Sequence, residues 1–499
     1  MFGKLAEKCP VPLPDPDTER VRYNMNNKTP AQTGGGTLEK NLSPMNVLSL
    51  AVGCMIGWGA FILPGDTFLL KAGPGGTAIA LGLSALIMVI IAMNYSFMIQ
   101  RCPVTGGAFT YTREAFGETH AFVCSWFLSL SYLAIVPLNG TAIALISRVL
   151  FPEALQFGFH YSVAGYDVYL AEVVLASAVL ALFAILSIRG VRSAGLFENG
   201  LVIALVVGIL VLSGAAVLQG PPAFANLKPA FSPDTPPVAG VLGIVAVAPW
   251  AFAGFETIPQ AVEEFRFPMK KTKRLMVASI LAGAAVYAIL NTITAMIIPE
   301  QYGSWVSYLH AVPGLSGLIS LPTFHSAHIL LGKIGLAFLG LAVLAAILSS
   351  IIGFYMATSR LLYSMARAGL LPRWFGEIHG TFKTPANAIL FTLLASLAAL
   401  PFGRTALSWI VNMSSIGASI GSCYTCLAAF KAARREKEYR FLPMAVVGFV
   451  MSVVFMVLLL VPIPGTDASL SKASYVCLLV WSVLGALFYG WTRKKNRKA

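Results

Sequence analysis

Charged residues are scarce in this chain of 499 residues. Asp, Glu, Lys and Arg together make up only 11% of it, whereas a soluble chain carries about 25%. Hydrophobic residues reach 57%, and the mean hydropathy is +0.76. The short alternating segments of a membrane β-barrel are also lacking. Apolar runs of about 18 residues or more recur instead, so we predict an all-α polytopic membrane protein.

Patterns that support catalysis are lacking as well. We find no phosphate loop and no cluster of His, Asp or Ser at a predicted membrane face, and His325 and His328 have the spacing of metal ligands on a helix but no nearby third ligand. The seven cysteines include one CxxC pair, Cys423 and Cys426, inside an apolar run without a nearby histidine. This setting favours helix packing over metal or redox chemistry. We therefore expect no enzyme and no cofactor.

Twelve apolar runs predict twelve transmembrane helices. Their first residues lie near Met45, Thr77, His120, Tyr169, Leu196, Val238, Leu275, Ile329, Pro385, Ala406, Leu442 and Ser474. The segment before them is polar, is rich in Pro, Asn and Gly, and has no apolar core typical of a signal peptide. We expect this segment to be a flexible tail.

Basic residues are distributed unevenly between the two sides of these spans. With the N-terminus placed inside, all but six of the 35 Lys and Arg residues face the cytoplasm. This bias predicts a multi-pass protein of the cell (inner or plasma) membrane with both termini cytoplasmic. It also explains the net charge of +14 without nucleic acid as a partner, because basic tails contact anionic membrane lipid. Nothing in the sequence specifies an oligomeric state.

Two of the predicted helices are interrupted in the middle. The first contains GCMIGWG at residues 53–59, and the sixth contains APWAFAGFE at residues 248–256. A backbone break inside lipid is tolerated only where it is buried or lines a cavity. Interruptions at matching places in two halves of a chain indicate an inverted-repeat transporter, which we favour over two unrelated kinks.

The predicted segments are a flexible cytoplasmic N-terminal tail (1–42), a first inverted repeat of helices 1–5 (43–220), a second of helices 6–10 (238–430), helices 11–12 (441–492) and a basic cytoplasmic tail (493–499).

Such breaks create a binding site without formal charges. The amides that begin one half-helix carry partial positive charge, and the carbonyls that end the other carry partial negative charge. A substrate carboxylate suits the amides, and a substrate ammonium suits the carbonyls. The paired breaks therefore predict a cradle for a small amino acid or amine.

At four places the chain resembles the amino acid–polyamine–organocation permease family. GCMIGWGAFILPG resembles the signature of its first helix, and PWAFAGFET resembles that of its sixth. CPVTGGAFTYTREAFG, at 102–117, resembles its loop between the second and third helices. SRLLYSMARAGLLPRWF with TPANAI, within 359–389, resembles the end of its eighth helix and the following loop. The resemblance implies a leucine-transporter-like fold of 5+5 inverted repeats plus two further helices, with alternating access to a central site.

The same resemblance implies which residues bind the substrate. The matching positions are Met55, Gly57, Trp58, Gly59, Trp250 and Ala253. In the family, amides at the break of the first helix (57–59) hold the carboxylate, and carbonyls at the other three positions meet the amine. Trp250 also occupies the place of an aromatic gate, and Glu256 matches an acidic position implicated in gating and proton sensing.

The chain departs from the family at two places. The first concerns the substrate site, and the second leaves the coupling ion, H⁺ or Na⁺, open. The family usually has Ser or Thr at position 58, so Trp58 removes a hydroxyl donor and fills space. Many proton-coupled members carry a lysine in the fifth helix, and LFENGLVIALVVGILVL (196–212) has none. The residues that match the sodium ligands of relatives of the fold are Gly53 and Ile56 through their carbonyls, and Ser349 and Ser350 through their hydroxyls. The alternative is that these serines hydrogen-bond to the backbone of their own helix.

We therefore expect a secondary active transporter that works as a proton- or sodium-coupled symporter. The alternative mechanism is exchange of an amino acid for its decarboxylated amine. Glu256 is the ionisable residue expected nearest the bilayer midplane, where such groups are by default functional. Its alternative role is structural, as a carboxyl hydrogen-bonded to a broken-helix carbonyl. Glu263, Glu264 and Arg266 are expected either to form an inner gate with basic residues or to pair at the surface.

Overall fold

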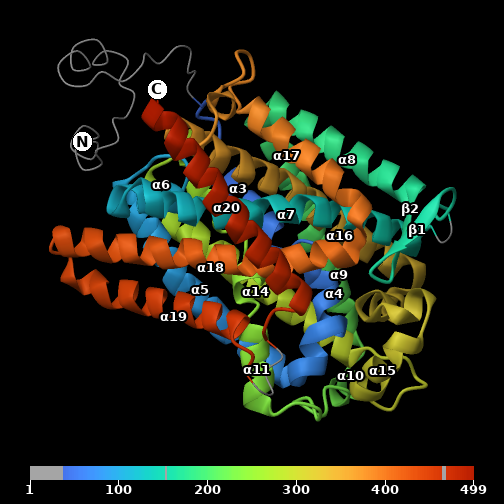
Figure 1. Ribbon diagram of the computed structural model, residues 1–499. Coiled ribbons are helices and arrows are strands. Elements are labelled where there is room, and N and C mark those ends of the chain that lie inside the picture. Colours follow the sequence, from blue (N-terminus) through green and yellow to red (C-terminus); the bar gives the residue numbers. More distant parts are fainter. Residues whose placement is uncertain (1–37, 152–153, 464–467, 499) are drawn as a thin grey trace.

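Long apolar helices run side by side through the computed structural model, which describes residues 38–151, 154–463 and 468–498 (Figure 1). Within these residues, nine helical stretches are long and apolar enough to cross a membrane. They are Gly59–Arg101, Glu118–Arg148, Leu170–Arg189, Phe197–Leu218, Met269–Met296, Pro322–Arg367, Ala386–Arg435, Tyr439–Leu460 and Lys472–Thr492. An apolar chain in lipid adopts helices because each helix satisfies its own backbone hydrogen bonds.

Ten of the twelve span starts predicted from the sequence lie within five residues of a helix start, whereas the helices that correspond to Thr77 and Ile329 begin at Leu69 and Pro322. The α-helices are α3 (Pro44–Met55), α4 (Gly59–Leu63), α5 (Leu69–Arg101), α6 (Ala108–Phe116), α7 (Glu118–Leu150), α8 (Leu170–Arg189), α9 (Val191–Leu218), α10 (Pro221–Ala225), α11 (Pro237–Val245), α12 (Ala248–Ala251), α13 (Thr257–Gln260), α14 (Thr272–Met296), α15 (Trp305–Ala311), α16 (Pro322–Arg367), α17 (Ala386–Ala399), α18 (Gly403–Arg435), α19 (Leu442–Leu460) and α20 (Lys472–Lys498). A π-helical turn, η1 (Pro64–Phe68), follows α4, and the 3₁₀ turns are η2 (Val262–Glu264), η3 (Met269–Lys271), η4 (Val312–Gly314), η5 (Gly317–Ser320), η6 (Arg373–Gly376), η7 (Leu400–Phe402) and η8 (Tyr439–Phe441).

Three of the nine stretches are bent, and each bend contains a glycine with positive φ. Gly73 (φ 70°) bends α5, Gly332 (φ 58°) bends α16, and Gly403 (φ 72°) separates α17 from α18. At Gly73 a side chain would also collide with another segment, because a Cβ atom would lie 2.7 Å from the carbonyl carbon of Phe231. Each bend lies close to a span start predicted from the sequence.

The two predicted interruptions are present as breaks in the helices. The first helix ends at Met55 and resumes at Gly59, so that α3 and α4 are separated by three residues without regular structure. The sixth is divided into α11, the short α12 and, after a run of turns at 252–256, α13. Each of the two predicted halves of the chain therefore contains one apolar helix that is broken in its middle.

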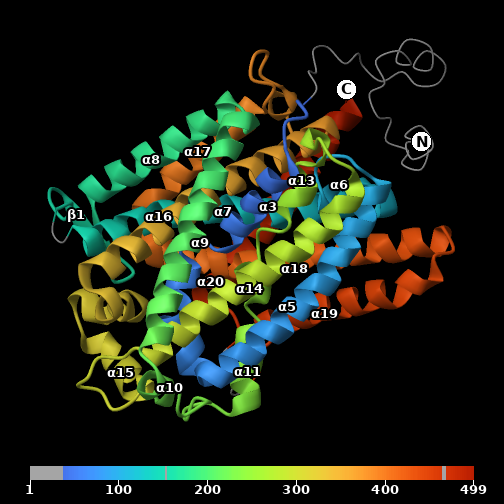
Figure 2. The ribbon, with the colours of Figure 1, turned by 180° about the vertical axis from the view of Figure 1, so that it is seen from behind.

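The bundle has two distinct ends. At one of them, which we call the tail side, lie the start of the described chain and the C-terminal end of α20 (Figure 1). Away from it, at what we call the hairpin side, lie α10, α15 and the antiparallel hairpin of β1 (His160–Val163) and β2 (Tyr166–Tyr169) (Figure 2). The hairpin was not expected from the sequence.

A short backbone pairing closes the tail side. The amides of Asn41 and Leu42 both donate to the carbonyl of Glu264, at 3.0 and 2.9 Å, and the amide of Arg266 donates to the carbonyl of Leu42 at 3.0 Å. The last residues of the predicted N-terminal tail are therefore attached to the end of the sixth helix. The rest of that tail, 1–37, lies outside the described residues.

The centre of the bundle is formed by α3, α7, α16 and α18. Helix α16 packs against α9, α7 and α3, and α18 packs against α7 and α19. By contrast, α8, α9 and α20 expose many large apolar side chains, as helices that face lipid do. The two breaks lie in this central region, where the buried face of α9 also contacts the first of them.

Candidate functional site

The two helix breaks are in direct contact. Gly254 has φ 156°, and a Cβ atom there would lie 2.7 Å from the amide nitrogen of Met55 and 2.8 Å from the carbonyl oxygen of Ala51. Trp250 lies over the other half of the first helix, where a Cβ on Gly59 would be 2.5 Å from its ring. Both glycines are needed for this close approach, which only the absence of a side chain permits.

The break in the first helix leaves amide groups without acceptors. The amides of Ala60 and Phe61 turn back to the carbonyls of Gly57 and Trp58, each at 3.1 Å. The amides of Gly57 and Trp58 themselves donate no hydrogen bond within the described residues. These are the orphan donors that the first turn of any helix presents, and they carry the partial positive charge that suits an anion.

Both breaks also contain carbonyl groups that lack the regular hydrogen bonds of a helix. The carbonyl of Met55 accepts a long bond of 3.4 Å from the hydroxyl of Tyr287, and that of Trp250 accepts the amide of Ala253 at 3.0 Å. The carbonyl of Ala253 accepts no hydrogen bond in the described chain. The six residues predicted to bind substrate therefore gather at one place, where the two breaks meet.

The side chain of Trp58 lies on the hairpin side of the point where the two breaks meet. Its side chain is buried, its ring centroid is 6.2 Å from that of Phe324, and the guanidinium carbon of Arg404 lies 5.4 Å from the indole centroid. The indole N–H has no hydrogen-bond partner in the described residues. Trp58 thus fills space beside the break, and a cation from α18 covers it.

Glu256 is 2% exposed and faces α7. The hydroxyl of Tyr132 donates to its Oε2 atom at 3.2 Å. No broken-helix carbonyl hydrogen-bonds to its carboxyl in the described part of the chain, although the sequence had suggested such a contact as the structural alternative. Glu256 is held instead by a neighbouring helix of the first half.

The two serines of α16 contact other helices rather than their own. Ser349 donates a hydrogen bond to Oε1 of Glu198 in α9, and Ser350 accepts one of 3.0 Å from the side-chain amide of Asn139 in α7. Within the described residues neither hydroxyl bonds to the backbone of α16, which was the alternative for both. Gly53 in α3 lies directly against Ser349, without room for a Cβ atom.

The break also frees the carbonyl of Gly53. In a continuous helix this oxygen would accept the amide of Gly57, which does not bond to it here. The neighbouring amide of Ile56 still reaches the carbonyl of Val52 at 3.0 Å, so the regular pattern stops at this point. Ile56 itself is fully buried. The four predicted sodium ligands therefore lie around the break, where α3 meets α16.

Beyond these residues, ion pairs close the tail side. Arg360 in α16 binds both carboxylate oxygens of Glu264, at 2.8 and 3.1 Å, and both side chains are 1% exposed. Arg367 and Glu263 form a longer pair of 3.3 Å whose side chains are 39% and 23% exposed. Of the two arrangements expected for these carboxylates, Glu264 adopts a buried pair and Glu263 a surface pair.

Sequence reasoning missed several residues of this region. Glu198 stands in the stretch of the fifth helix that was inspected only for a lysine, although a charge in an apolar run was itself a signal. From the sequence, Arg404 and Arg360 counted only toward the distribution of basic residues between the two sides of the spans. Asn139 carries no signal that distinguishes it from other polar residues of α7.

In the described part of the hairpin side, an ion pair joins a partly exposed arginine to a buried carboxylate. Arg148 binds both oxygens of Glu172, at 2.6 and 2.7 Å, beneath the hairpin. Burial raises the pKa of Tyr166 on β2, and the neighbouring Arg148 guanidinium opposes that rise. This cluster joins α7 to α8 and has no contact with the breaks that the structure records.

The fold and the site define a class: a multi-pass membrane protein in which two broken helices meet inside the bundle, as in transporters. Residues 42–484 match the amino acid permease family, and the chain belongs to this family. It is therefore a permease of the amino acid–polyamine–organocation group and not an enzyme.

Its relatives transport different small molecules. The chain is 25% identical to the methylthioribose transporter of Bacillus subtilis, over 93% of this chain and 96% of the relative. It is 25% identical to the branched-chain amino acid permease BcaP of the same species, over 94% and 96%. It is 23% identical to the low-affinity putrescine importer PlaP of Escherichia coli, over 94% and 97%.

Proposed function

We propose that the protein is a secondary active transporter of a small amino acid or amine and works by alternating access. The observation that carries the proposal is the contact between the two breaks, which presents unbonded amides at Gly57 and Trp58 and an unbonded carbonyl at Ala253. Buried backbone groups without partners are costly, so their persistence at one place favours a ligand that satisfies them. The names of the relatives support an amino acid or amine as this ligand.

In this proposal the substrate lies between the two breaks. Its carboxylate, where it has one, accepts hydrogen bonds from the amides of residues 57–59, and its amine donates to the carbonyls of Met55, Trp250 and Ala253. Trp250 acts as the aromatic gate over Gly59. Because Trp58 occupies volume beside these amides, we infer a compact substrate.

The architecture we propose is that of twelve transmembrane helices arranged as two inverted repeats plus two further helices. The nine apolar stretches support this count. The bends at Gly73 and Gly403 each divide one stretch into two helices, and the broken helix of α11–α13, which is not among the nine, is a further one. We further propose that the tail side faces the cytoplasm of the cell membrane, as the excess of basic residues there favours.

The coupling ion is proposed to be a proton or sodium. The carbonyls of Gly53 and Ile56 and the hydroxyls of Ser349 and Ser350 are oxygen donors, as sodium requires, and three of these four residues lie in direct contact with neighbours from other helices. Sodium bound there would hold the first and eighth helices together. The alternative mechanism is exchange. A comparison of uptake into empty and preloaded vesicles distinguishes exchange from ion-coupled uptake.

A substitution test addresses the cradle. Gly57→Leu and Gly59→Leu should each reduce proteoliposome uptake by at least 10-fold, because a bulky side chain blocks approach to the backbone amides. At Gly59 the added carbons would also displace the ring of Trp250. Binding is assayed in parallel by thermal shift against amino acids and amines, since a ligand of the folded state raises Tm.

The matched control is Gly82→Leu. Gly82 lies on an exposed face of α5, and a Cβ atom there would meet nothing within 4 Å. This variant should express and transport like the wild type. Uptake near the wild-type rate by both the Gly57 and Gly59 variants would remove the amide cradle from the proposed mechanism.

A further inference from the structure

Arg404 is a cation without a carboxylate partner. It is the second residue of α18, it is partly buried, and its guanidinium carbon lies 5.4 Å from the centroid of the Trp58 indole ring. Within the described residues its hydrogen bonding is limited to a long contact of 3.5 Å with the hydroxyl of Thr141 in α7, and it forms no ion pair. A cation held away from water without a counter-charge is unfavourable, so an anion near it is stabilising.

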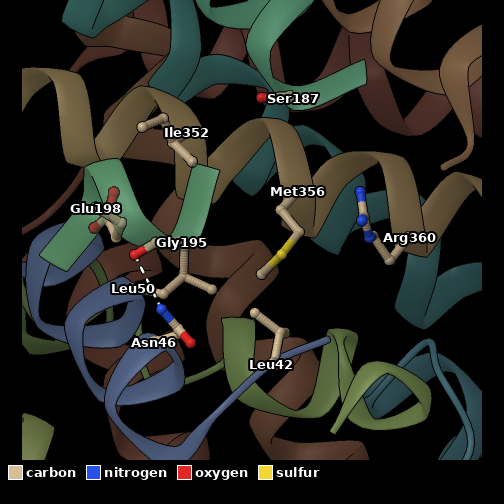
Figure 3. Close-up of a pocket in the computed structure, with 9 residues that line it drawn as sticks. All are labelled: Leu42, Asn46, Leu50, Ser187, Gly195, Glu198, Ile352, Met356 and Arg360. Atoms are coloured by element: carbon tan, nitrogen blue, oxygen red, sulfur yellow. Dashed lines mark hydrogen bonds between the residues drawn. The ribbon is translucent and has the colours of Figure 1, made fainter. Parts of the chain in front are cut away.

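Two other arginines of the bundle show the more usual arrangement. Figure 3 shows Arg360 in the lining of a cavity on the tail side, and this arginine is bound by both oxygens of Glu264. On the hairpin side, Arg148 binds both oxygens of Glu172. Both cations are therefore neutralised by a neighbouring carboxylate, whereas the charge of Arg404 acts on whatever comes close to it.

Arg404 lies between the hairpin and the break in the first helix. Trp58 stands in that break, and Phe324 of α16 packs against it, with ring centroids 6.2 Å apart. Arg404 covers the same indole from α18. The preceding residue, Gly403, touches the hairpin, because a Cβ atom there would lie 2.9 Å from Cγ2 of Val168. A substrate that approaches the break from the hairpin side therefore comes close to this guanidinium.

The other groups around Arg404 leave this position positive. Asp66 of η1 lies within electrostatic range of Arg404, but it is exposed to solvent, which screens its charge. From β2, the hydroxyl of Tyr166 lies within the same range and is uncharged at neutral pH. This hydroxyl and the indole N–H of Trp58 are both buried and lack hydrogen-bond partners in the described part of the chain. The uncharged polar groups beside Arg404 can thus also donate to an anion.

We propose that Arg404 determines substrate specificity: its charge beside the first break favours amino acids, which carry a carboxylate, over diamines. The inference rests on the proposed transport function and narrows its substrate class from amino acids or amines to amino acids. The guanidinium attracts the carboxylate of a zwitterion, and this attraction offsets its repulsion of the ammonium. A diamine has two cations and no anion, so nothing offsets the repulsion. Both effects are stronger than in water, because the interior of the bundle has a lower dielectric constant.

The test compares three competitors that differ in charge. Isoleucine and 2-methylbutylamine share a side chain and differ only in the carboxylate, and putrescine carries two ammonium groups. Inhibition constants are measured in proteoliposome counterflow of radiolabelled isoleucine or putrescine, whichever the wild type exchanges. In the wild type the constant for putrescine should exceed that for isoleucine by about 10-fold or more, with 2-methylbutylamine between them. A wild type that binds putrescine as tightly as isoleucine overturns the inference.

Two substitutions separate the charge of Arg404 from its packing. Arg404→Gln keeps a donor for Thr141 but removes the charge, and should lower the putrescine-to-isoleucine ratio of inhibition constants about 5-fold or more. Arg404→Lys keeps the charge and should leave this ratio within about 2-fold of the wild type. A structural role would not make the ratio follow the charge. An unchanged ratio in Arg404→Gln, or an equal fall in both variants, contradicts the inference.

Asp66→Asn decides the matter if Arg404→Gln does not fold. Asp66 is exposed, and its removal takes away a negative charge that partly offsets Arg404, so the ratio should rise about 2-fold or more. An unchanged or lower ratio counts against the inference. The matched control is Lys472→Gln, which removes an exposed cation at the start of α20, away from the tail side, and should leave the ratio unchanged (Figure 1). A change as large as that in Arg404→Gln would assign the effect to overall surface charge instead.

The same assay separates this inference from the proposed function. Counterflow of neither labelled compound by the wild type speaks against the proposed function. Counterflow by the wild type together with an unchanged ratio in Arg404→Gln speaks against the role of Arg404 alone.

Discussion

The tail side and the hairpin side of the paired breaks are closed by different chemistry. Among the described residues, five charged side chains are buried, and four of them belong to the tail-side parts of the structure: Glu198, Glu256, Glu264 and Arg360. Next to the breaks on the hairpin side, closure is made by the rings of Trp58 and Phe324 beneath Arg404.

This difference affects how each side can open. Removal of one partner from a buried ion pair leaves an uncompensated charge, so the contact is either intact or lost at high cost. Aromatic pairs contribute about 0.5–1.5 kcal/mol each and tolerate changes of geometry. We therefore expect substitutions on the tail side to have all-or-none effects and those on the hairpin side to have graded ones.

The largest expected effect is on the tail side. Arg360→Ala should lower the free energy of unfolding by about 3–5 kcal/mol, because it leaves Glu264 buried and unpaired. The measurement is denaturant unfolding of purified protein in detergent, followed by tryptophan fluorescence.

The exposed neighbouring pair is the control for Arg360. Arg367→Ala should cost only about 0–1 kcal/mol, because the pair with Glu263 is partly in solvent. Equal losses for the two variants would show that burial does not distinguish these pairs. The double variant Arg360→Met with Glu264→Leu should recover most of the lost stability.

A smaller effect is expected at Glu256. Glu256→Gln keeps an acceptor for the hydroxyl of Tyr132 but cannot change its charge. We expect it to bind substrate, to flatten the pH dependence of uptake, and to slow gradient-driven uptake several-fold more than exchange. Proteoliposome uptake from pH 5 to 8 provides the check, with Tyr132→Phe as the variant that removes only the hydrogen bond. A wild-type pH profile in Glu256→Gln would assign this carboxyl a structural role.

The smallest effect is expected on the hairpin side, at Trp58. Trp58→Ser removes the ring beneath Arg404, a contact of about 0.5–1 kcal/mol, and opens space beside the amides. It should broaden the range of α-amino acids that compete for uptake, with changes of a few-fold in their inhibition constants. Trp374→Ser, at an exposed tryptophan of η6, should leave the competition profile unchanged. An unchanged profile in Trp58→Ser would show that the indole does not limit the pocket.

Much of the fold followed from the sequence because lipid imposes simple rules. Apolar runs predicted the helices, and the glycines and prolines clustered within two of them predicted the interruptions at 53–59 and 248–256, since such residues weaken a helix. The bend at Gly332 and the hairpin at 160–169 were not predicted. Short strands in a connecting segment carry too little periodicity to be recognised.

The candidate site was only partly predictable, because its remaining members depend on tertiary contacts. Glu256 was identified as a charge in an apolar run, and Glu198 has the same signature but was passed over in the search for a lysine. Arg360 stands in a basic segment that would normally be solvated, and its burial follows from its pairing with Glu264 across the bundle. Such pairing leaves no trace in local sequence pattern.

The backbone pairing of Leu42 with Phe265 has a consequence for biosynthesis. The two residues belong to segments that leave the ribosome at very different times, because α3 to α13 must all be made between them. Residues 41 and 42 therefore remain without their partners until the sixth predicted helix has been made. Pairings so distant in sequence form late and are slow. An assembly intermediate that stops before this point therefore lacks this closure of the tail side.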